Sequence, residues 1–401
     1  MVDKCSNLEI RWKEDGPCDG DVFFDTEVVS GACLLPVDAV GALSMTDSDR
    51  RYSNLKSFLF LRHIDALRER RLEAPVHIRI KPTNRCNHRC WYCAYRHDDL
   101  QLGDDMDLAD AIPADKMNEI IDDIVSMGVR AVTFSGGGEP TIYKPLPESV
   151  ERLAKGGVRI ATLTNGSNLK GRVAEAFARF GTWVRVSIDA WDDDSYARAR
   201  SIKPGSFNAL IANLKTFAAS GTRCELGASF IVGSENFSHI YEACATLKDA
   251  GVRHVKLSAV VVSNDAQESN SYHAPIRAKV AEEIERAQAL SDGSFSIINH
   301  YHSLADRFTH PYRMCPSLQL LTVIGADSKV YACQDKAYTE SGLLGSIEKQ
   351  SFRDFWFSEQ NRERVFSLNP SQSCQHHCVS AAKNRLIHEL LALDPEHSVF
   401  V

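Results

Sequence analysis

The sequence predicts an α/β fold: a partial, TIM-like (β/α)6 barrel followed by a small α+β domain. Between residues 76 and 262, short apolar runs rich in β-branched residues alternate with helical patterns. Glycine stands at each joint between a helical pattern and the next apolar run, where it suits a helix C-cap. Repeated βα units build a parallel sheet with right-handed crossovers. Six such units predict a partial barrel that is open on one side.

The predicted strands and helices alternate regularly. The strands cover residues 76–83, 129–136, 158–166, 183–190, 223–232 and 252–262. The helices between them cover residues 113–127, 146–155, 169–180, 207–219 and 237–250. The joints carry Gly128, Gly156, Gly157, Gly181, Gly221 and Gly251. On such barrels chemistry takes place at the C-terminal ends of the strands, so the βα loops should carry the functional residues.

Three segments are predicted along the chain. Residues 1–75 form an N-terminal extension of unknown role, and its basic stretch 61–75 is interpreted as a solvated helix face. Residues 76–290 form the barrel domain, and residues 291–401 form a C-terminal α+β domain. The C-terminal elements expected are a hairpin over 318–333 that turns at 325–327, an amphipathic helix over 351–368 and a last helix over 380–393.

The composition is that of a globular protein. The chain has 401 residues, of which 44% are hydrophobic and 25% charged, and this balance argues against a disordered or fibrous chain. Lys and Arg number 46 against 53 Asp and Glu, a net charge of −7, so no nucleic acid partner is expected. The sequence shows neither the apolar core of a secretory signal nor a run of about 18 apolar residues. We therefore expect a cytoplasmic protein with no membrane partner.

Three of the 12 cysteines stand in the loop after the first predicted strand. Cys86, Cys90 and Cys93 follow the spacing C-x3-C-x2-C within NRCNHRCWYCAYR. Cytosolic thiols stay reduced, so clustered ones favour metal binding or catalysis over disulfides. Three thiolates on one loop can hold three corners of a four-iron cluster and leave one iron open. The alternatives are a zinc site, which normally needs four ligands, and incidental buried cysteines.

The segment CNHRCWYC resembles the cluster-binding signature of the radical S-adenosylmethionine (SAM) superfamily, including the aromatic Tyr92 before the last cysteine. The resemblance covers residues 76–262 and extends into the C-terminal domain. It implies a [4Fe-4S] cluster held by Cys86, Cys90 and Cys93, whose open iron is chelated by the methionine part of SAM. It further implies reductive cleavage of SAM to a 5′-deoxyadenosyl radical, which removes a hydrogen atom from a substrate.

Two further loop motifs fit the same family. FSGGGEP follows the second strand, and the resemblance assigns the binding of the methionine amino group to a backbone run of Gly136, Gly137, Gly138 and Glu139. Glycines let backbone approach a ligand closely, although a glycine triplet can also be a simple turn. LTNGS ends the third strand, and Thr164, Asn165 and Gly166 resemble an element near the adenosine. An ordinary Asn-Gly turn is the alternative.

The fourth and fifth strands supply the remaining SAM-binding candidates. Ser187 and Asp189 are two residues apart, so their side chains should emerge on the same side of the fourth strand, and the resemblance gives the serine a role near the nucleoside or the carboxylate. Arg200, with Arg198 as second choice, resembles the arginine that pairs with the SAM carboxylate; a solvated helix arginine is the alternative. The end of the fifth strand, residues 229–232, is expected either against adenine or in the core.

Four cysteines lie beyond the barrel. Cys315 and Cys333 bracket the predicted hairpin, and Cys374 and Cys378 form a C-x3-C pair. Four thiolates can enclose a complete cluster or bind zinc. The pattern resembles the SPASM/twitch extension of radical SAM enzymes, in the shorter form that implies one auxiliary [4Fe-4S] cluster. The remaining cysteines, interpreted as unassigned or buried thiols, are Cys5, Cys18, Cys33, Cys224 and Cys244.

These features together predict an oxidoreductase. An auxiliary cluster can accept an electron from a substrate radical, so we expect dehydrogenation of a carbohydrate-like small molecule, with a flavodoxin or ferredoxin as reducing partner. One alternative is a redox-neutral reaction, because the family that this chain resembles also includes epimerases and dehydratases. The others are modification of a peptide or protein, tRNA modification, which the acidic charge disfavours, and a zinc-stabilised binding protein. Asp189 and Lys256 are candidate proton-transfer groups, and the polar run 263–273 is expected as a loop that lines the barrel mouth or the surface.

Overall fold

A computed structural model describes residues 51–96, 100, 102–301 and 307–400. A single sheet of ten strands runs through them in the order β10-β9-β8-β1-β2-β3-β4-β5-β6-β7. The strands are β1 (His77–Ile80), β2 (Ala131–Phe134), β3 (Arg159–Thr164), β4 (Gly181–Ser187), β5 (Glu225–Val232), β6 (His254–Ala259), β7 (Ser296–His300), β8 (Leu321–Ile324), β9 (Lys329–Tyr331) and β10 (Leu343–Ser346).

The first six strands confirm the predicted βα units. Neighbours from β1 to β7 all pair in parallel, and β8 also pairs in parallel with β1. The predicted hairpin is the antiparallel pair of β8 and β9. The sheet is not a closed barrel, since β7 and β10 are its two edges. The sheet crosses the boundary expected at residue 291, because both β7 and the hairpin extend the barrel sheet.

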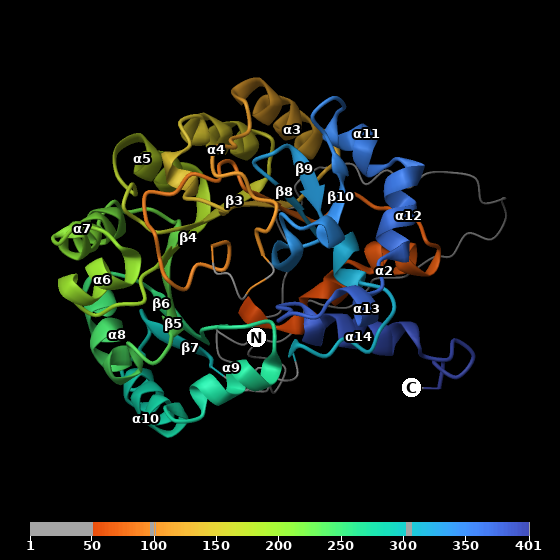
Figure 1. Cartoon of the computed structure of the whole chain (residues 1–401). Coiled ribbons are helices and arrows are strands. Elements are labelled where there is room, and N and C mark those ends of the chain that lie inside the picture. The colour runs from red at the N-terminus through yellow and green to blue at the C-terminus, as the bar shows by residue number, and fades with distance from the viewer. Residues whose placement is uncertain (1–50, 97–99, 101, 302–306, 401) are drawn as a thin grey trace, which may run out of the picture. The chain divides into compact units, whose positions relative to one another are not determined.

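Helices lie along the outer side of the barrel strands (Figure 1). Those of the barrel are α3 (Ala114–Ser126), α4 (Leu146–Lys155), α5 (Gly171–Phe180), α6 (Asp193–Arg200), α7 (Ser206–Ala218), α8 (Ile240–Asp249), α9 (Ala266–His273) and α10 (Arg277–Gln288). The others are α2 (Leu61–Arg68), α11 (Phe352–Trp356), α12 (Glu359–Ser367), α13 (Pro370–Ser373) and α14 (Ala381–Leu391), with a 3-10 turn η2 (Asn54–Leu59) before α2.

Two predicted elements were wrong. The run 263–273 is not a loop throughout, because Asp265 accepts a hydrogen bond from the Glu268 N–H and caps α9. The helix expected over 351–368 is interrupted after Trp356. There Ser358 adopts an extended backbone and its Oγ accepts from the Asn361 N–H, which starts α12 as a new helix. Serine is favoured at such N-caps because its side chain satisfies a free helix N–H.

Four of the joint glycines act as the sequence predicts. Gly128, Gly157, Gly221 and Gly251 have φ between 69° and 82°, the left-handed conformation that ends helices and favours glycine. Gly181 differs, with φ −71°, and begins β4 directly after α5.

The two faces of the sheet carry different side chains. Ile78, Ile80, Val184 and Val186 are fully buried and belong to the hydrophobic core beneath the helices. Burial of each such side chain contributes roughly 1.5–3 kcal/mol. Side chains alternate along a strand, so Arg79 and its counterparts face the inner side of the barrel. In the part of the chain that is described, no helix is long and apolar enough to cross a membrane.

Candidate functional site

The three clustered cysteines lie in the loop that leaves the C-terminal end of β1. Cys86, Cys90 and Cys93 are free, half-buried thiols. The Cys93 N–H donates to the Cys90 carbonyl at 3.3 Å, and the His88 N–H donates to Cys86 Sγ at 3.5 Å. Burial raises the pKa of Cys86 to about 11 and also raises that of Cys93. Thiols of this kind are protonated at neutral pH, so a bound metal has to replace the protons.

The all-cysteine donor set of this loop suits an iron–sulfur cluster. Among the described residues, three possible ligand atoms lie within 4.8 Å of one another only at Cys333, Asp335 and His376. The three sulfurs of the loop after β1 are therefore farther apart. Cysteine sulfur is the usual ligand of iron–sulfur clusters, so the donor set fits a cluster.

A buried ion pair stands beside the cysteine loop. Arg200 Nη2 donates to Asp189 Oδ2 at 2.7 Å, and Tyr92 donates its hydroxyl to the same oxygen at 2.6 Å. Arg200 Nη1 lies 3.7 Å from Cys90 Sγ, and its Nε is buried without a partner among the described residues. The guanidinium therefore faces the cysteine loop with one donor unused.

Asp189 owes its position to a strained backbone. Its φ is 48°, a left-handed value that is uncommon for residues other than glycine. The side chains of Ser187 and Asp189 were expected on the same side of the strand, but they point to different partners. Asp189 turns toward Arg200, whereas Ser187 Oγ lies 3.5 Å from Ser229 Oγ on the inner face. The Ile231 N–H donates to Asp189 Oδ1, and Asn236 Nδ2 donates to the Asp189 carbonyl at 3.0 Å.

The glycine loop after β2 packs against the cysteine loop at close range. A Cβ on Gly138 would lie 2.0 Å from the Arg85 carbonyl oxygen, and one on Gly137 would lie 2.5 Å from Asn84 Oδ1. The Gly138 N–H donates to the Thr83 carbonyl at 3.2 Å. Only glycine permits this approach, so the motif brings its backbone next to the cysteine loop.

Glu139 joins the glycine loop to the end of β3. Its carboxylate accepts from Thr141 N at 3.0 Å, Thr141 Oγ1 at 2.6 Å, Thr164 Oγ1 at 2.5 Å and Asn165 N at 2.7 Å. Burial raises the pKa of this carboxyl, and these donors oppose the rise. Asn165 Nδ2 donates to Asn87 Oδ1 at 2.9 Å. The Glu139 side chain is thus an anchor that fixes the two loops, whereas Gly136 and its neighbours offer backbone.

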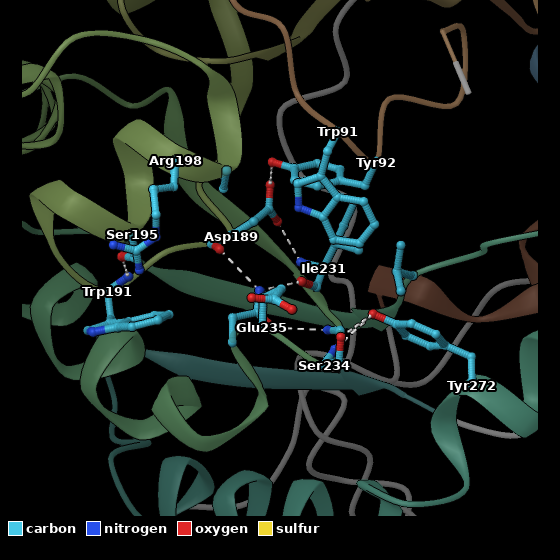
Figure 2. Close-up of a pocket in the computed structure, with 14 residues that line it drawn as sticks. Trp91, Tyr92, Asp189, Trp191, Ser195, Arg198, Ile231, Ser234, Glu235 and Tyr272 are labelled. Carbon is cyan, nitrogen blue, oxygen red and sulfur yellow. Dashed lines mark hydrogen bonds between the residues drawn. The ribbon is translucent and has the colours of Figure 1, made fainter. Parts of the chain in front are cut away.

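A pocket of about 400 Å³ opens beside these groups. Figure 2 shows Tyr92 and Trp91 from the cysteine loop on one side of it and Trp191 and Ser195 on another. Arg198, Ile231 and Asp189 also line it. Of the fourteen residues that line the pocket, Tyr92, Asp189, Arg198 and Ile231 were sequence candidates. The pocket also includes Tyr272, whose hydroxyl accepts from the Ser234 N–H at 2.9 Å and which the sequence had placed in a loop.

The four C-terminal cysteines come together although 63 positions (378 − 315) separate the first from the last. Cys315, Cys333, Cys374 and Cys378 are free thiols. Burial raises the pKa of all four, and each of Cys315, Cys333 and Cys378 also feels the charge of others in the set. Buried thiols that lie close together are well suited to bind a metal. Cys224 and Cys244 are buried elsewhere, as expected, and Cys5, Cys18 and Cys33 lie outside the described residues.

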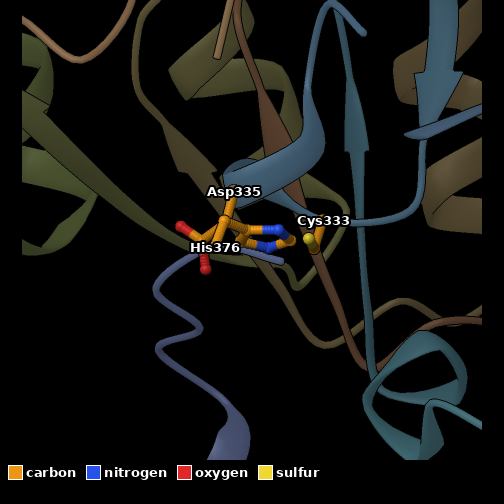
Figure 3. Close-up of side chains that lie close together, drawn as sticks. All are labelled: Cys333, Asp335 and His376. Atoms are coloured by element: carbon orange, nitrogen blue, oxygen red, sulfur yellow. The ribbon is translucent and has the colours of Figure 1, made fainter. Parts of the chain in front are cut away.

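Asp335 and His376 stand beside one of these thiols. Figure 3 shows the imidazole of His376 close to Cys333 and the Asp335 carboxylate. The Val379 N–H donates to Asp335 Oδ2 at 3.2 Å. Burial lowers the pKa of His376 to about 3, so this imidazole is neutral at physiological pH. Asp335 was not a candidate from the sequence.

Lys81 is a site residue that sequence reasoning missed. Its side chain is fully buried at the C-terminal end of β1, and Nζ donates to the Gly136 carbonyl at 3.0 Å and to the Tyr95 hydroxyl. Burial, then the charge of Arg79, lowers the pKa of Lys81 to about 7. The only signal in the sequence was a lysine inside an apolar strand, five residues before the first cysteine.

Comparisons with known proteins identify the two cysteine-bearing regions. Residues 80–243 match the model of the Radical SAM superfamily, and residues 315–379 match that of an iron-sulfur cluster-binding domain named SPASM. The Fe-coproporphyrin III synthase of Methanosarcina barkeri is 28% identical over 39% of this chain and 37% of its own length. A GTP 3′,8-cyclase of Synechococcus elongatus is 31% identical over 35% of this chain and 41% of its own length. The match thus spans less than half of these relatives.

Solved structures share the fold over more of the chain. Streptococcus suis SuiB bound to its precursor peptide SuiA superposes with a TM-score of 0.56 at 15% identity, over 90% of this chain and 84% of SuiB. The protein anSMEcpe with bound AdoMet superposes with a TM-score of 0.52 at 15% identity, over 76% of this chain and 89% of its own. Residues 80–243 thus form a radical SAM domain. The second domain of the chain is a SPASM domain, and the pair implies SAM and [4Fe-4S] clusters as cofactors.

Proposed function

We propose that this protein is a radical SAM oxidoreductase that dehydrogenates a carbohydrate-like small molecule. The proposal rests mainly on two separate sets of cysteine thiols. Three of these thiols lie in the loop after β1 and four in the C-terminal domain. When bound, the cofactors supply a 5′-deoxyadenosyl radical for hydrogen abstraction and, at the second thiol group, an acceptor for the electron that an oxidised substrate must lose.

Cys86, Cys90 and Cys93 would hold the first cluster and leave one iron for SAM. The backbone of Gly136, Gly137 and Gly138 supports an amino-group site because Lys81 and Glu139 fix the loop from two sides. Fixed backbone groups bind a ligand without the entropy cost of ordering a loop. This arrangement favours a preformed SAM site.

Arg200 remains the first candidate for the SAM carboxylate and Arg198 the second. The unpartnered Nε of Arg200 and the short distance of its Nη1 from Cys90 support this choice. Arg198 lines the pocket instead. The nucleoside part of SAM is assigned to Ser187 on the inner face and to Thr164 and Asn165 at the end of β3. Tyr92 and Ile231 line the adjoining pocket.

Cys315, Cys333, Cys374 and Cys378 would hold the auxiliary [4Fe-4S] cluster. The all-cysteine donor set and the SPASM match over residues 315–379 support a cluster. A single zinc ion held by Cys333, Asp335 and His376, whose ligand atoms lie within 4.8 Å of one another, is the alternative. An electron acceptor beside the substrate favours net oxidation, and a flavodoxin or ferredoxin would supply the electron for SAM cleavage.

Anaerobic reconstitution tests the proposal. Two clusters predict about eight irons per chain, and reduction in the presence of SAM should yield 5′-deoxyadenosine. Cys86→Ala, Cys90→Ala and Cys93→Ala should each abolish that product. Cys374→Ala should lower the iron content to about four but retain SAM cleavage. Zinc at the C-terminal site, or no cleavage by the fully reconstituted protein, would contradict the proposal.

Peptide modification is the second candidate. It is favoured by the shared fold with SuiB, whose structure holds a precursor peptide. Residues 1–50, where a peptide-recognition segment would be sought, lie outside the described residues. Incubation of the reconstituted protein with sugar substrates and with peptides encoded by neighbouring genes separates the two candidates. Only the true substrate should be converted to a product in proportion to the SAM that is consumed.

A further inference from the structure

The inner face of the barrel carries a group of basic side chains that the SAM chemistry does not use. Arg79 lies on β1, Arg185 on β4 and Lys256 on β6. Their strand neighbours Val184, Val186 and Leu257 are fully buried in the core beneath the helices. The three cations therefore point to the opposite side, into the barrel, where they are half-buried.

These cations lack partners among the described residues. Neither Arg79 nor Arg185 forms an ion pair there, and the Nε of each is buried without a hydrogen bond. Arg185 Nη1 has a long contact of 3.5 Å to the Tyr52 hydroxyl, and the guanidinium carbon lies 5.5 Å from the centre of the Trp183 ring. Lys256 Nζ lies 5.9 Å from the centre of the Tyr52 ring and has no carboxylate near it. An unpaired charge in a protein interior is costly.

Other charged groups on the same face are paired, so the lack of partners is specific. Glu225 on β5 forms an ion pair with Arg51, and its Oε1 also lies 2.8 Å from Nδ1 of His254 on β6. Lys81, two residues beyond Arg79, is hydrogen-bonded to Gly136 and Tyr95. The unpaired set is thus Arg79, Arg185 and Lys256, which we call the inner cation group.

The members of the inner cation group lie close enough to repel one another. Burial lowers the pKa of Arg79 and the charge of Arg185 lowers it further, whereas Asp335, Tyr95 and Cys333 oppose the fall. Burial, then Arg185, Arg307 and Arg79, lowers the pKa of Lys256 to about 7. Cations that destabilise one another's charged forms do not stabilise the fold. Such an arrangement is typical of a functional site rather than a structural one.

One member of the inner cation group, Arg79, lies near the second thiol set. Lys81, on the same face as Arg79, is near enough to both Cys93 and Cys333 for each thiol to act on its pKa, after the larger effects of burial and Arg79. Cys333 acts on Arg79 as well. A substrate that reacts at the first cluster and passes an electron to the second must occupy the space between them.

We propose that Arg79, Arg185 and Lys256 bind an oxyanion of the substrate, a phosphoryl or carboxylate group, inside the barrel. This inference rests on the proposed function, since it narrows the small-molecule substrate to an acidic one. Guanidinium groups pair with both oxyanions through two parallel hydrogen bonds, and the unpaired Nε atoms of both arginines provide such donors. A bound oxyanion would also remove the repulsion within the inner cation group.

Calorimetric titration of the anaerobically reconstituted protein tests this site without requiring turnover. Inorganic pyrophosphate is the phosphoryl probe, and malonate is the carboxylate probe. Arg79→Gln, Arg185→Gln and Lys256→Met should each weaken binding of the preferred probe roughly tenfold to a hundredfold. Arg185→Lys should lose less than Arg185→Gln. Arg253→Gln, which changes an exposed arginine on the approach to β6, is the matched control and should bind like the wild type.

The outcomes separate this inference from the proposed function. Tighter binding of pyrophosphate than malonate identifies a phosphorylated substrate, and the reverse order identifies a carboxylated one. No binding of either probe, or equal affinity in the three variants and the control, overturns the inner anion site. The same samples are assayed for 5′-deoxyadenosine, so a protein that binds the anion but never cleaves SAM refutes only the proposed function. Melting temperatures equal to or above that of the wild type show that the variants fold, because each removes an unpaired charge.

Discussion

Arg200 and Asp189 form a buried ion pair, with Nη2 2.7 Å from Oδ2, directly beside the cysteine loop. Both side chains are almost fully buried, and the pair links helix α6 to the second residue after β4. Tyr92, in the cysteine loop, donates to the same carboxylate oxygen. One carboxylate therefore fixes the distance between the cysteine loop and the arginine proposed to bind SAM.

Asp189→Asn should destabilise the fold strongly. The substitution leaves the Arg200 charge buried and uncompensated, which typically costs about 3–5 kcal/mol. Urea unfolding of the metal-free protein measures the loss. As a control, Asp122→Asn breaks an exposed pair with Arg152 and should change the free energy of unfolding by about 1 kcal/mol or less. Equal stability of the two variants would mean that the buried pair is absent in solution.

Glu139→Gln should weaken SAM binding because it loosens the two loops that the carboxylate joins. Its carboxylate accepts hydrogen bonds from four donors in the loops after β2 and β3. A glutamine side chain would offer these donors only one oxygen, and its amide NH2 group would face the remaining donors. Each unsatisfied donor costs about 1–3 kcal/mol. Equilibrium dialysis with labelled SAM should show at least a roughly tenfold loss in affinity.

The matched control for Glu139 is Glu148→Gln on α4. Glu148 is exposed and pairs with Arg172 at the surface, so SAM affinity should not change. If the Glu139 and Glu148 variants bind SAM equally well, the anchor does not support the SAM site.

Sequence patterns predicted the local elements well because those patterns are local. β-branched runs located the first six strands, and cysteine spacing located both thiol groups. Two features could not be predicted from the sequence. The parallel pairing of β8 with β1 joins residues more than 240 positions apart (321 − 77 = 244), and the pairing of Asp189 with Arg200 depends on a positive φ that no spacing rule predicts.

The inner cation group was missed for a similar reason. Each of Arg79, Arg185 and Lys256 stands alone within an apolar strand, and only Lys256 was a sequence candidate. Their proximity arises from the curvature and register of the sheet, and their lack of partners is visible only when the other inner-face groups are placed.

Gly138→Ala should abolish SAM binding. The new methyl group would lie 2.0 Å from the Arg85 carbonyl oxygen, so the glycine loop and the cysteine loop must move apart. Overpacking of this kind costs about 1–3 kcal/mol, and the displaced backbone would no longer meet the ligand. Dialysis with SAM and the iron content after reconstitution are the measurements.

Gly293→Ala is the control for the glycine loop, because nothing lies within 4 Å of the added methyl. It should leave iron content and SAM affinity unchanged. Normal SAM binding by Gly138→Ala would show that the close contact between the two loops is dispensable.

Lys256→Met should change how stability depends on pH. The pKa of Lys256 is lowered from its ordinary 10.5 to about 7 by burial and by neighbouring arginines. Between these values the unfolded chain binds a proton that the folded chain does not, so the free energy of unfolding rises with pH. The slope from one such group is at most about 1.4 kcal/mol per pH unit. The variant should therefore show a shallower rise between pH 7 and about 8.5, below the ordinary pKa of cysteine.

Urea unfolding of the metal-free protein at three pH values in this window measures the slope. The exposed Lys215→Met on α7 is the control and should follow the wild type. Lys81, whose pKa is also lowered to about 7, keeps part of the slope in the Lys256 variant, so a reduction is expected rather than a loss. Parallel curves for the wild type and Lys256→Met would mean that Lys256 is solvated in the folded protein, because only a desolvated lysine beside other cations gives up its proton near neutral pH.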